Sequence, residues 1–316
     1  FSFDPSLRAD QAARQIHLHL LDIIETNIPG VKADLDSEFL HDLRVAVRRS
    51  RSALSQIKGV FSDAELESFK SRLAWVGQVT GPTRDMDVFL LGYDQYRASL
   101  PERFREDLDP LHDFLVNHQK TEQRLLVKKI NSPHFRTLLK EWREFLEATP
   151  ELQDGSPLDA ATPIARLASR RIFKMFQRVL KDGMAIDDDS PAEMLHDLRK
   201  DCKKLRYLME FFQHLYPKKK IRRLIRSLKD LLNNLGNFQD LEVQADKLRE
   251  YARQMVEEGQ APHATLLAMG MLVDGLLRRQ QLARQEFAQR FARFSRKENQ
   301  RMFRSLFAPG ARKDNS

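Results

Sequence analysis

Cysteine is almost absent from this chain of 316 residues, in which Cys202 is the only thiol. A single cysteine excludes an intramolecular disulfide framework and a metal site made of several thiolates, and it fits a reducing compartment. Long apolar runs are also missing, because no stretch approaches the roughly 18 residues that a membrane-crossing helix needs. We therefore expect a soluble, cytoplasmic protein that does not span a membrane.

Alternating runs of β-branched residues are absent as well, whereas apolar residues recur at three- and four-residue spacing almost throughout. This periodicity predicts an all-α fold, and 41% hydrophobic residues suffice for a sizeable core. Capping boxes, Ser62 with Glu65 and Ser190 with Glu193, predict two helix starts. The predicted breaks between helices lie at Pro29-Gly30, Gly59, Gly81-Pro82, Pro101, Pro133, residues 150–163, Gly183, Pro217, Gly236 and residues 258–262.

An internal repeat organises the chain. The segment HDLRVAVRRSRSAL begins at His41, and HDLRKDCKKLRYLM begins 155 residues later at His196. The same offset aligns Asp85 with Asp240, which we interpret as helix caps or as partners that orient an arginine. The repeat predicts two antiparallel helical bundles related by a pseudo-twofold axis, over residues 1–155 and 156–308, followed by a frayed tail at 309–316.

Each copy of the repeat predicts a helix with a cationic stripe beside an apolar one. Four arginines and one aspartate lie between residues 41 and 51, so like charges three and four residues apart repel one another. A charged helix face is usually only solvated surface, but a repulsion repeated at matching positions favours an anionic ligand. The two stripes consist of His41, Arg44, Arg48 and Arg51, and of His196, Arg199, Lys203 and Arg206.

Other basic stretches add to the charge, although the whole chain carries only +8. One stripe runs from Arg290 and Arg293 to Arg304, another from Arg166 to Lys181, and either pattern is also typical of plain surface. The run KKKIRRLIR at residues 218–226 follows a proline, so we interpret it as a solvated helix start or loop.

The paired HxxRxxxR/K motifs, with the segments GPTRDMDV and LGNFQDLEV that follow them, resemble the CHAD domain, the conserved histidine α-helical domain. The resemblance implies two helical bundles with internal twofold symmetry. It also implies that inorganic polyphosphate binds a basic central surface or pore, and that the protein associates with polyphosphate granules. The candidate binding residues are His41, Arg44, Arg48, Arg49, Arg51, His196, Arg199, Lys200, Lys203, Lys204, Arg206, Arg290 and Arg293.

These residue types suit such a polyanion, because an arginine fork takes two phosphate oxygens at once and a lysine acts as a point charge. The backbone of RNA or DNA carries similar charge and is an alternative ligand. A nucleic-acid-binding site, however, should contain aromatic side chains for base stacking among its cations, and Tyr207 is the only aromatic residue inside either motif. An enzyme, or an accessory domain of a triphosphate- or polyphosphate-processing enzyme, is the other alternative.

No Walker loop, zinc-ligand spacing or nucleophile triad is present, however. Triphosphate tunnel hydrolases, which often accompany CHAD domains, carry Glu-x-Glu-x-Lys, whereas Lys70 here follows Glu65 and Glu67 one position late. The sequence therefore favours a non-enzymatic binding protein without a metal or cofactor. It leaves the oligomeric state open.

Overall fold

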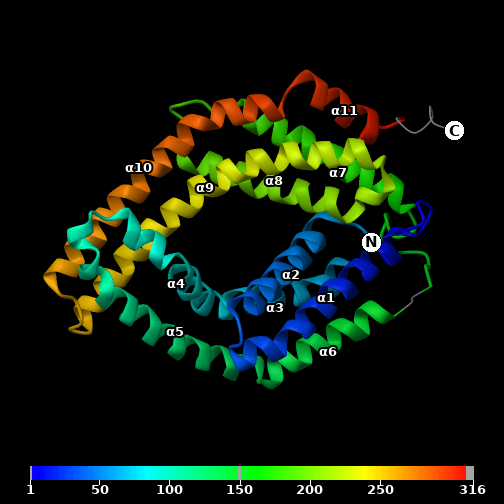
Figure 1. Ribbon diagram of the computed structural model, residues 1–316. Coiled ribbons are helices and arrows are strands. Elements are labelled where there is room, and N and C mark those ends of the chain that lie inside the picture. Colours follow the sequence, from blue (N-terminus) through cyan, green and yellow to red (C-terminus); the bar gives the residue numbers. More distant parts are fainter. Residues whose placement is uncertain (1, 149–150, 311–316) are drawn as a thin grey trace.

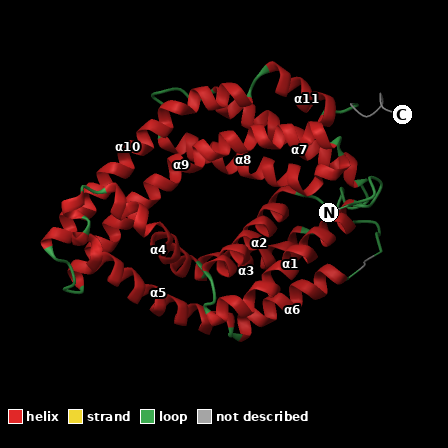
Figure 2. Cartoon of the chain, viewed as in Figure 1, coloured by secondary structure: helices red, strands yellow, loops and turns green. Residues whose placement is uncertain are grey.

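A computed structural model describes residues 2–148 and 151–310 of the chain (Figures 1 and 2). The described residues form helices and loops and no strands, which confirms the all-α prediction. None of these helices combines the length and the apolar composition that crossing a bilayer requires. In chain order they are α1 (Ala9–Ala33), α2 (Ser37–Gln56), α3 (Asp63–Val79), α4 (Gly81–Ser99), η1 (Glu102–Phe104), η2 (Glu106–Leu108), α5 (Asp109–Ile130), α6 (Pro133–Glu147), α7 (Ile164–Met184), α8 (Ala192–Phe212), η3 (Gln213–Leu215), α9 (Lys218–Glu257), α10 (His263–Phe294) and α11 (Lys297–Phe307).

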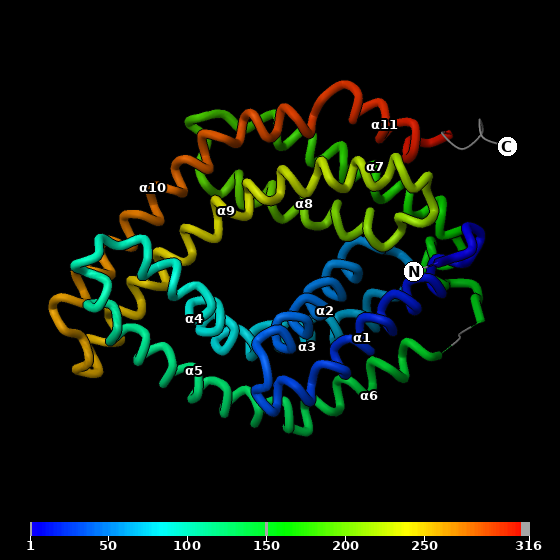
Figure 3. The backbone as a smooth tube through the Cα atoms, in the orientation of Figure 1, coloured from blue at the N-terminus to red at the C-terminus, as the bar shows by residue number. Residues whose placement is uncertain are grey.

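The helices are arranged as an elongated ring (Figures 1 and 3). Helices α2, α4, α8 and α9 follow its inner edge, whereas α5 and α6 lie on one outer edge and α10 and α11 on the other. Helices α2 and α8, which carry the two repeated motifs, approach one another through their C-terminal halves, where Arg49 Nη2 lies 3.8 Å from Glu210 Oε2. The two motifs are therefore neighbours in space although 155 residues separate them.

Three pairs of helix starts follow the 155-residue offset of the sequence repeat. Helices α1, α2 and α3 begin at residues 9, 37 and 63, and α7, α8 and α9 begin 155 residues later, at 164, 192 and 218. The boundary predicted near residue 155 lies in the connection between α6 and α7. The pseudo-twofold axis itself, and the division into two domains, stay predictions.

Two apolar cores hold the ring together, and each contains residues from both predicted halves. The larger core joins α1, α2 and α6 with α7, α8 and the first part of α9. The smaller one packs Phe89 of α4 and Phe114 of α5 against Leu248 of α9 and Leu272 of α10. The two halves of the sequence thus share buried surface at both ends of the ring.

Two predicted breaks are wrong. Helix α9 runs for 40 residues through Gly236, whereas α3 and α4 are separate helices that meet at Thr80, beside Gly81. The difference follows from Pro82, which disfavours helical backbone before it, while Asn237 takes its place in the second copy. Helix α1 likewise continues through Pro29, and Gly30 gives the Phe39 ring room to lie against its backbone.

One of the two predicted capping boxes forms. The Ser62 side chain and Glu65 cap α3 reciprocally, as expected. The box at Ser190 is wrong, because α8 begins at Ala192 after Pro191 and the Ser190 hydroxyl donates instead to Asp187 Oδ1 at 2.8 Å. Gly183 lies in the last turn of α7, which ends at Met184, and the remaining predicted breaks separate helices. Residues 218–226 are the start of α9. Residues 311–316 of the predicted tail lie outside the described residues.

Candidate functional site

Helices α2 and α8 each bury an apolar stripe and turn cations away from it. On α2 the buried stripe includes Leu43 and Val47, and on α8 it includes Leu198, Cys202 and Leu205. Asp36 begins α2 by accepting a hydrogen bond from the backbone N–H of Glu38 at 2.8 Å. The amphipathic pattern therefore fixes which way the cations of both helices point.

Four cations from the two helices form one group, which we call the facing cations: Arg48 of α2 and Arg199, Lys203 and Arg206 of α8. Burial, followed by the charges of Arg199 and Arg48, lowers the pKa of Lys203 to about 8. Burial also lowers the pKa of Arg199, against the charge of Asp240 and reinforced by Arg48. Arg48 thus lies close enough to the second copy to disfavour its charges.

Two of the facing cations lack a direct anionic contact, although the charge of Asp240 acts on Lys203. Neither Arg48 nor Lys203 forms a hydrogen bond or an ion pair with any residue that the structure describes. Repulsion between cations is unfavourable, above all at the half-buried Lys203, and an anion bound between them would relieve it. The arrangement is therefore suited to binding a negatively charged group.

Arg44 and Arg199 occupy matching positions and are both tied to the helix that packs alongside. Arg44 donates to the Gly77 carbonyl at 2.9 Å and to Thr80 Oγ1 at 2.6 Å. Arg199 donates to Gln239 Oε1 at 2.9 Å and to Asp240 Oδ1 at 3.0 Å. These arginines therefore connect α2 and α8 to the helices that pack beside them.

The two repeated aspartates act on these arginines. Asp240 pairs directly with Arg199, and the charge of Asp85 favours the charged form of Arg44, although burial outweighs it and lowers the pKa of Arg44. Asp85 also lies 3.6 Å from Lys247 Nζ of α9. Their interpretation as partners that orient an arginine agrees with this geometry.

The two histidines have different partners. His41 Nδ1 lies 3.1 Å from Arg84 Nη2. His196 Nε2 lies 2.9 Å from Glu242 Oε2, but the geometry of this second contact is not that of a hydrogen bond. Glu38, His41 and Asp42 form the one group in the described chain whose potential metal-ligand atoms lie within 4.8 Å of one another. The Arg84 guanidinium beside His41 opposes a metal ion there.

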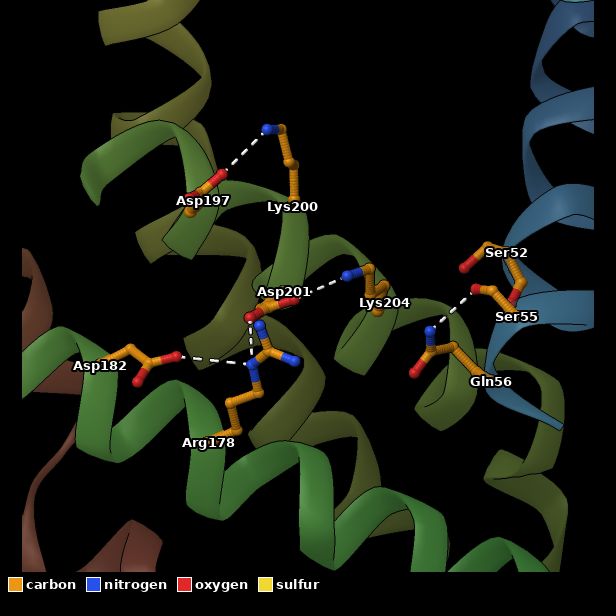
Figure 4. A network of polar contacts seen from close by, with 9 residues as sticks. All are labelled: Ser52, Ser55, Gln56, Arg178, Asp182, Asp197, Lys200, Asp201 and Lys204. Carbon is orange, nitrogen blue, oxygen red and sulfur yellow. Dashed lines mark hydrogen bonds and ion pairs between the residues drawn. The ribbon is translucent and has the colours of Figure 1, made fainter. Parts of the chain in front are cut away.

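Lys200 and Lys204 are held by acids of their own helix (Figure 4). Lys200 Nζ lies 2.9 Å from Asp197, and Lys204 Nζ lies 2.8 Å from Asp201, which also pairs with Arg178 of α7. The structure therefore does not bring these two lysines into the facing cations.

Arg49 and Arg51 border the facing cations, and Arg206 is one of them. Arg49 lies over the rings of Tyr207 and Phe211, with its guanidinium carbon 5.6 and 5.0 Å from the two centroids. Arg206 covers Tyr207 at 5.1 Å. Arg51 is exposed and lies against α3 beside Gly77.

Arg290 and Arg293 lie on α10, at the outer edge of the ring (Figure 1). The Arg290 guanidinium pairs with Asp230 at 3.0 Å and with Glu286 at 3.2 Å. The structure does not place this stripe with the facing cations. The sequence repeat could have separated these two arginines from the other candidate binding residues, because neither belongs to the duplicated motif.

The sequence interpretation missed three residues at the site, namely Arg84, Glu210 and Lys229. Glu210 forms ion pairs with cations of α2, α8 and α9, including Lys229, whose Nζ lies 3.5 Å from its carboxylate. A helical projection of one segment places charges on an arc but does not reveal partners on another helix. Only the position of Arg84 directly before the repeated Asp85 could have drawn attention to it.

The fold and its facing cations define an all-helical protein with a concentrated basic surface. The family model for the CHAD domain matches residues 15–249, and the chain belongs to this family. The search among curated proteins gave no significant match.

Two solved structures share the fold. The CHAD domain from the plant Ricinus communis matches with 24% sequence identity and a TM-score of 0.72, over 98% of this chain and 96% of that one. PptA from Streptomyces chartreusis matches with 16% identity and a TM-score of 0.66, over 90% of this chain and 99% of that one. At these identities the similarity bears on the fold alone.

Proposed function

We propose that the protein binds inorganic polyphosphate through the facing cations and does not cleave it, and that it associates with polyphosphate granules. One observation carries the proposal: Arg48 and Lys203 come from different copies of the repeat, the charge of Arg48 disfavours the charge of Lys203, and neither residue forms a hydrogen bond or an ion pair with a described residue. Membership of the CHAD family and the paired histidine and arginine motifs support the same ligand.

The chemistry of the ligand fits this surface. Polyphosphate is a flexible chain with about one negative charge per phosphate unit, so its affinity comes from many cations rather than from one pocket. Arginine forks at positions 48 and 206 would take oxygens in pairs, and the ammonium of Lys203 would gain an anionic partner beside them. The single thiol supports a binding role, since burial raises the pKa of Cys202 and so disfavours the nucleophilic thiolate.

Binding of an RNA or DNA backbone is the second candidate, because its phosphates carry the same charge. A protein that holds single-stranded bases uses exposed aromatic faces for stacking. Tyr207 is only 3% exposed, and Arg49 and Arg206 cover its ring. This observation favours polyphosphate over a nucleic acid as the ligand of the facing cations.

The deciding experiment compares long-chain polyphosphate, RNA of equal charge and tripolyphosphate in one binding assay at physiological salt. We expect the tightest binding for long-chain polyphosphate and no phosphate release when Mg²⁺ or Mn²⁺ is supplied. Arg48→Glu with Lys203→Glu should abolish most of the binding, whereas Lys200→Glu, on the same helix but outside the facing cations, should change it little. Equal affinity for RNA would remove the polyphosphate assignment, and phosphate release above the buffer blank would remove the non-enzymatic one.

A further inference from the structure

A basic cavity lies where the end of α8 and the start of α9 meet α2. It measures about 580 Å³, and four of its seven lining side chains are cations while one is a carboxylate. The lining residues are Arg49, Glu210, Gln213, Arg222, Ile225, Arg226 and Lys229. The cavity therefore has a strong excess of positive charge.

The carboxylate of Glu210 lines this cavity and pairs with cations around it. It lies 3.8 Å from Arg49, 3.7 Å from Arg206 and 3.5 Å from Lys229, which belong to three different helices. Its side chain is only 16% exposed. Three cations that converge on one oxyanion form the arrangement that a phosphate group requires.

The cavity continues from the facing cations. Arg206 contacts Glu210 and also lies close enough to Lys203 to lower its pKa, after the larger effects of burial, Arg199 and Arg48. Arg49 follows Arg48 directly in α2. A polyanion bound at the facing cations therefore has a charged path towards the cavity.

Two cations of the cavity are unused. Arg222 and Arg226 are exposed and form no hydrogen bond or ion pair within residues 2–148 and 151–310. At the repeat offset of 155, the counterparts of Arg222, Arg226 and Lys229 are Glu67, Ser71 and Ala74, none of them cationic. These three cations are thus specific to the second half of the chain, whereas Arg49 belongs to the duplicated motif.

We propose that the cavity is a second anion subsite, which takes a phosphoryl group of polyphosphate adjacent to the segment held by the facing cations. Glu210 holds Arg49, Arg206 and Lys229 together when the subsite is empty. Arg222 and Arg226 supply the positive charge that attracts the incoming phosphate. The inference rests on the proposed function and adds the direction in which the polyphosphate chain runs. A chain too long for the facing cations alone would extend from them towards α9.

Charge reversal of the unused cations tests the subsite. Arg222→Glu with Arg226→Glu should weaken long-chain polyphosphate binding by about tenfold, and should lower the slope of log affinity against log salt by about 1.4, the contribution of two phosphates. Lys218→Glu with Lys219→Glu is the matched control, because it makes the same charge change in the same basic run outside the cavity. Tripolyphosphate, which the facing cations bind alone, should respond alike to both double variants.

Glu210→Gln tests the role of the carboxylate. It keeps the side chain's shape and removes the internal anion, so we expect affinity for long-chain polyphosphate to rise severalfold. Circular dichroism checks folding, and Arg222→Gln with Arg226→Gln replaces the reversal if that variant unfolds. A reversal no more harmful than its control, or an unchanged affinity in Glu210→Gln, would overturn the subsite and leave the proposed function standing. No polyphosphate binding by the unaltered protein would overturn both.

Discussion

Lys203 tests whether burial and the neighbouring facing cations disfavour a positive charge at the site in the absence of a ligand. Burial, Arg199 and Arg48 lower its pKa from 10.5 to about 8, and an unscreened shift of this size corresponds to about 3 kcal/mol. Because part of the side chain is exposed, solvent screening reduces the penalty. We expect Lys203→Met, which keeps the long stem and removes the ammonium, to raise the free energy of unfolding by about 1–2 kcal/mol at pH 7.

The pH dependence of this effect separates charge from packing. The folded-state pKa of Lys203 lies below its unfolded value, so between pH 8 and 10.5 the unfolded chain binds more protons and stability rises with pH. Below pH 8 both states are protonated, and the whole penalty is present. Lys203→Met should lack this rise, so its stability advantage should shrink as the pH approaches 10.5.

Urea unfolding at several pH values between 7 and 10 measures both effects. Lys200→Met is the matched control on the same helix, since Lys200 is exposed and pairs with Asp197, and we expect a change within about 0.5 kcal/mol. Lys203→Met should bind polyphosphate more weakly while it is more stable. A Lys203→Met protein that is less stable at pH 7, or whose stability advantage does not change with pH, would refute the repulsion between the facing cations.

Three further outcomes follow from the same geometry. The logarithm of polyphosphate affinity should fall linearly with log salt by about 0.7 for each neutralised phosphate, and a salt-independent affinity would contradict binding by charge. Arg44→Met should lower the free energy of unfolding by about 1–3 kcal/mol, because Gly77 and Thr80 lose their donor, whereas Arg48→Met should not be destabilising; thermal unfolding compares the two. Burial lowers the pKa of His17 to about 3, so the unfolded state binds the extra proton between pH 3 and 6.5 and stability falls as the pH drops through that range. Replacement by leucine should reduce the loss between pH 7 and 4 by roughly 3 kcal/mol, and an equal loss in both proteins would contradict a neutral buried His17.

The sequence predicted the helices well because their periodicity and caps are local. Apolar spacing and the Ser62 capping box depend on residues within one or two turns. Gly236 was misjudged because glycine alone does not end a helix: Gly81 lies at a helix boundary because Pro82 follows it, and Asn237 gives α9 no such reason to stop. Pro29 was misjudged because the Gly30–Phe39 contact that supports this part of α1 comes from the next helix.

The candidate site could be predicted only in part, because helical spacing does not reveal which cations find partners. His41 to Arg51 and His196 to Arg206 do lie on the two helices that approach one another. Lys203 and Lys204 are adjacent in sequence, yet Lys204 pairs with Asp201 while Lys203 faces Arg48 and Arg199. These roles depend on contacts between helices, so the spacing along one helix does not contain them.

The structure also accounts for why one chain contains the same basic helix twice. A single helix with cations at i, i+3 and i+7 repels itself only weakly, since solvent surrounds its charges. When α2 and α8 approach, Arg48 adds to the charges of Arg199 and Lys203 in a place where burial already disfavours them. Each copy thereby raises the free energy of the other's cations, and an anion that touches both copies relieves more repulsion than an anion that touches one. A polyanion long enough to reach both helices is the ligand that such a pair favours over a single phosphate.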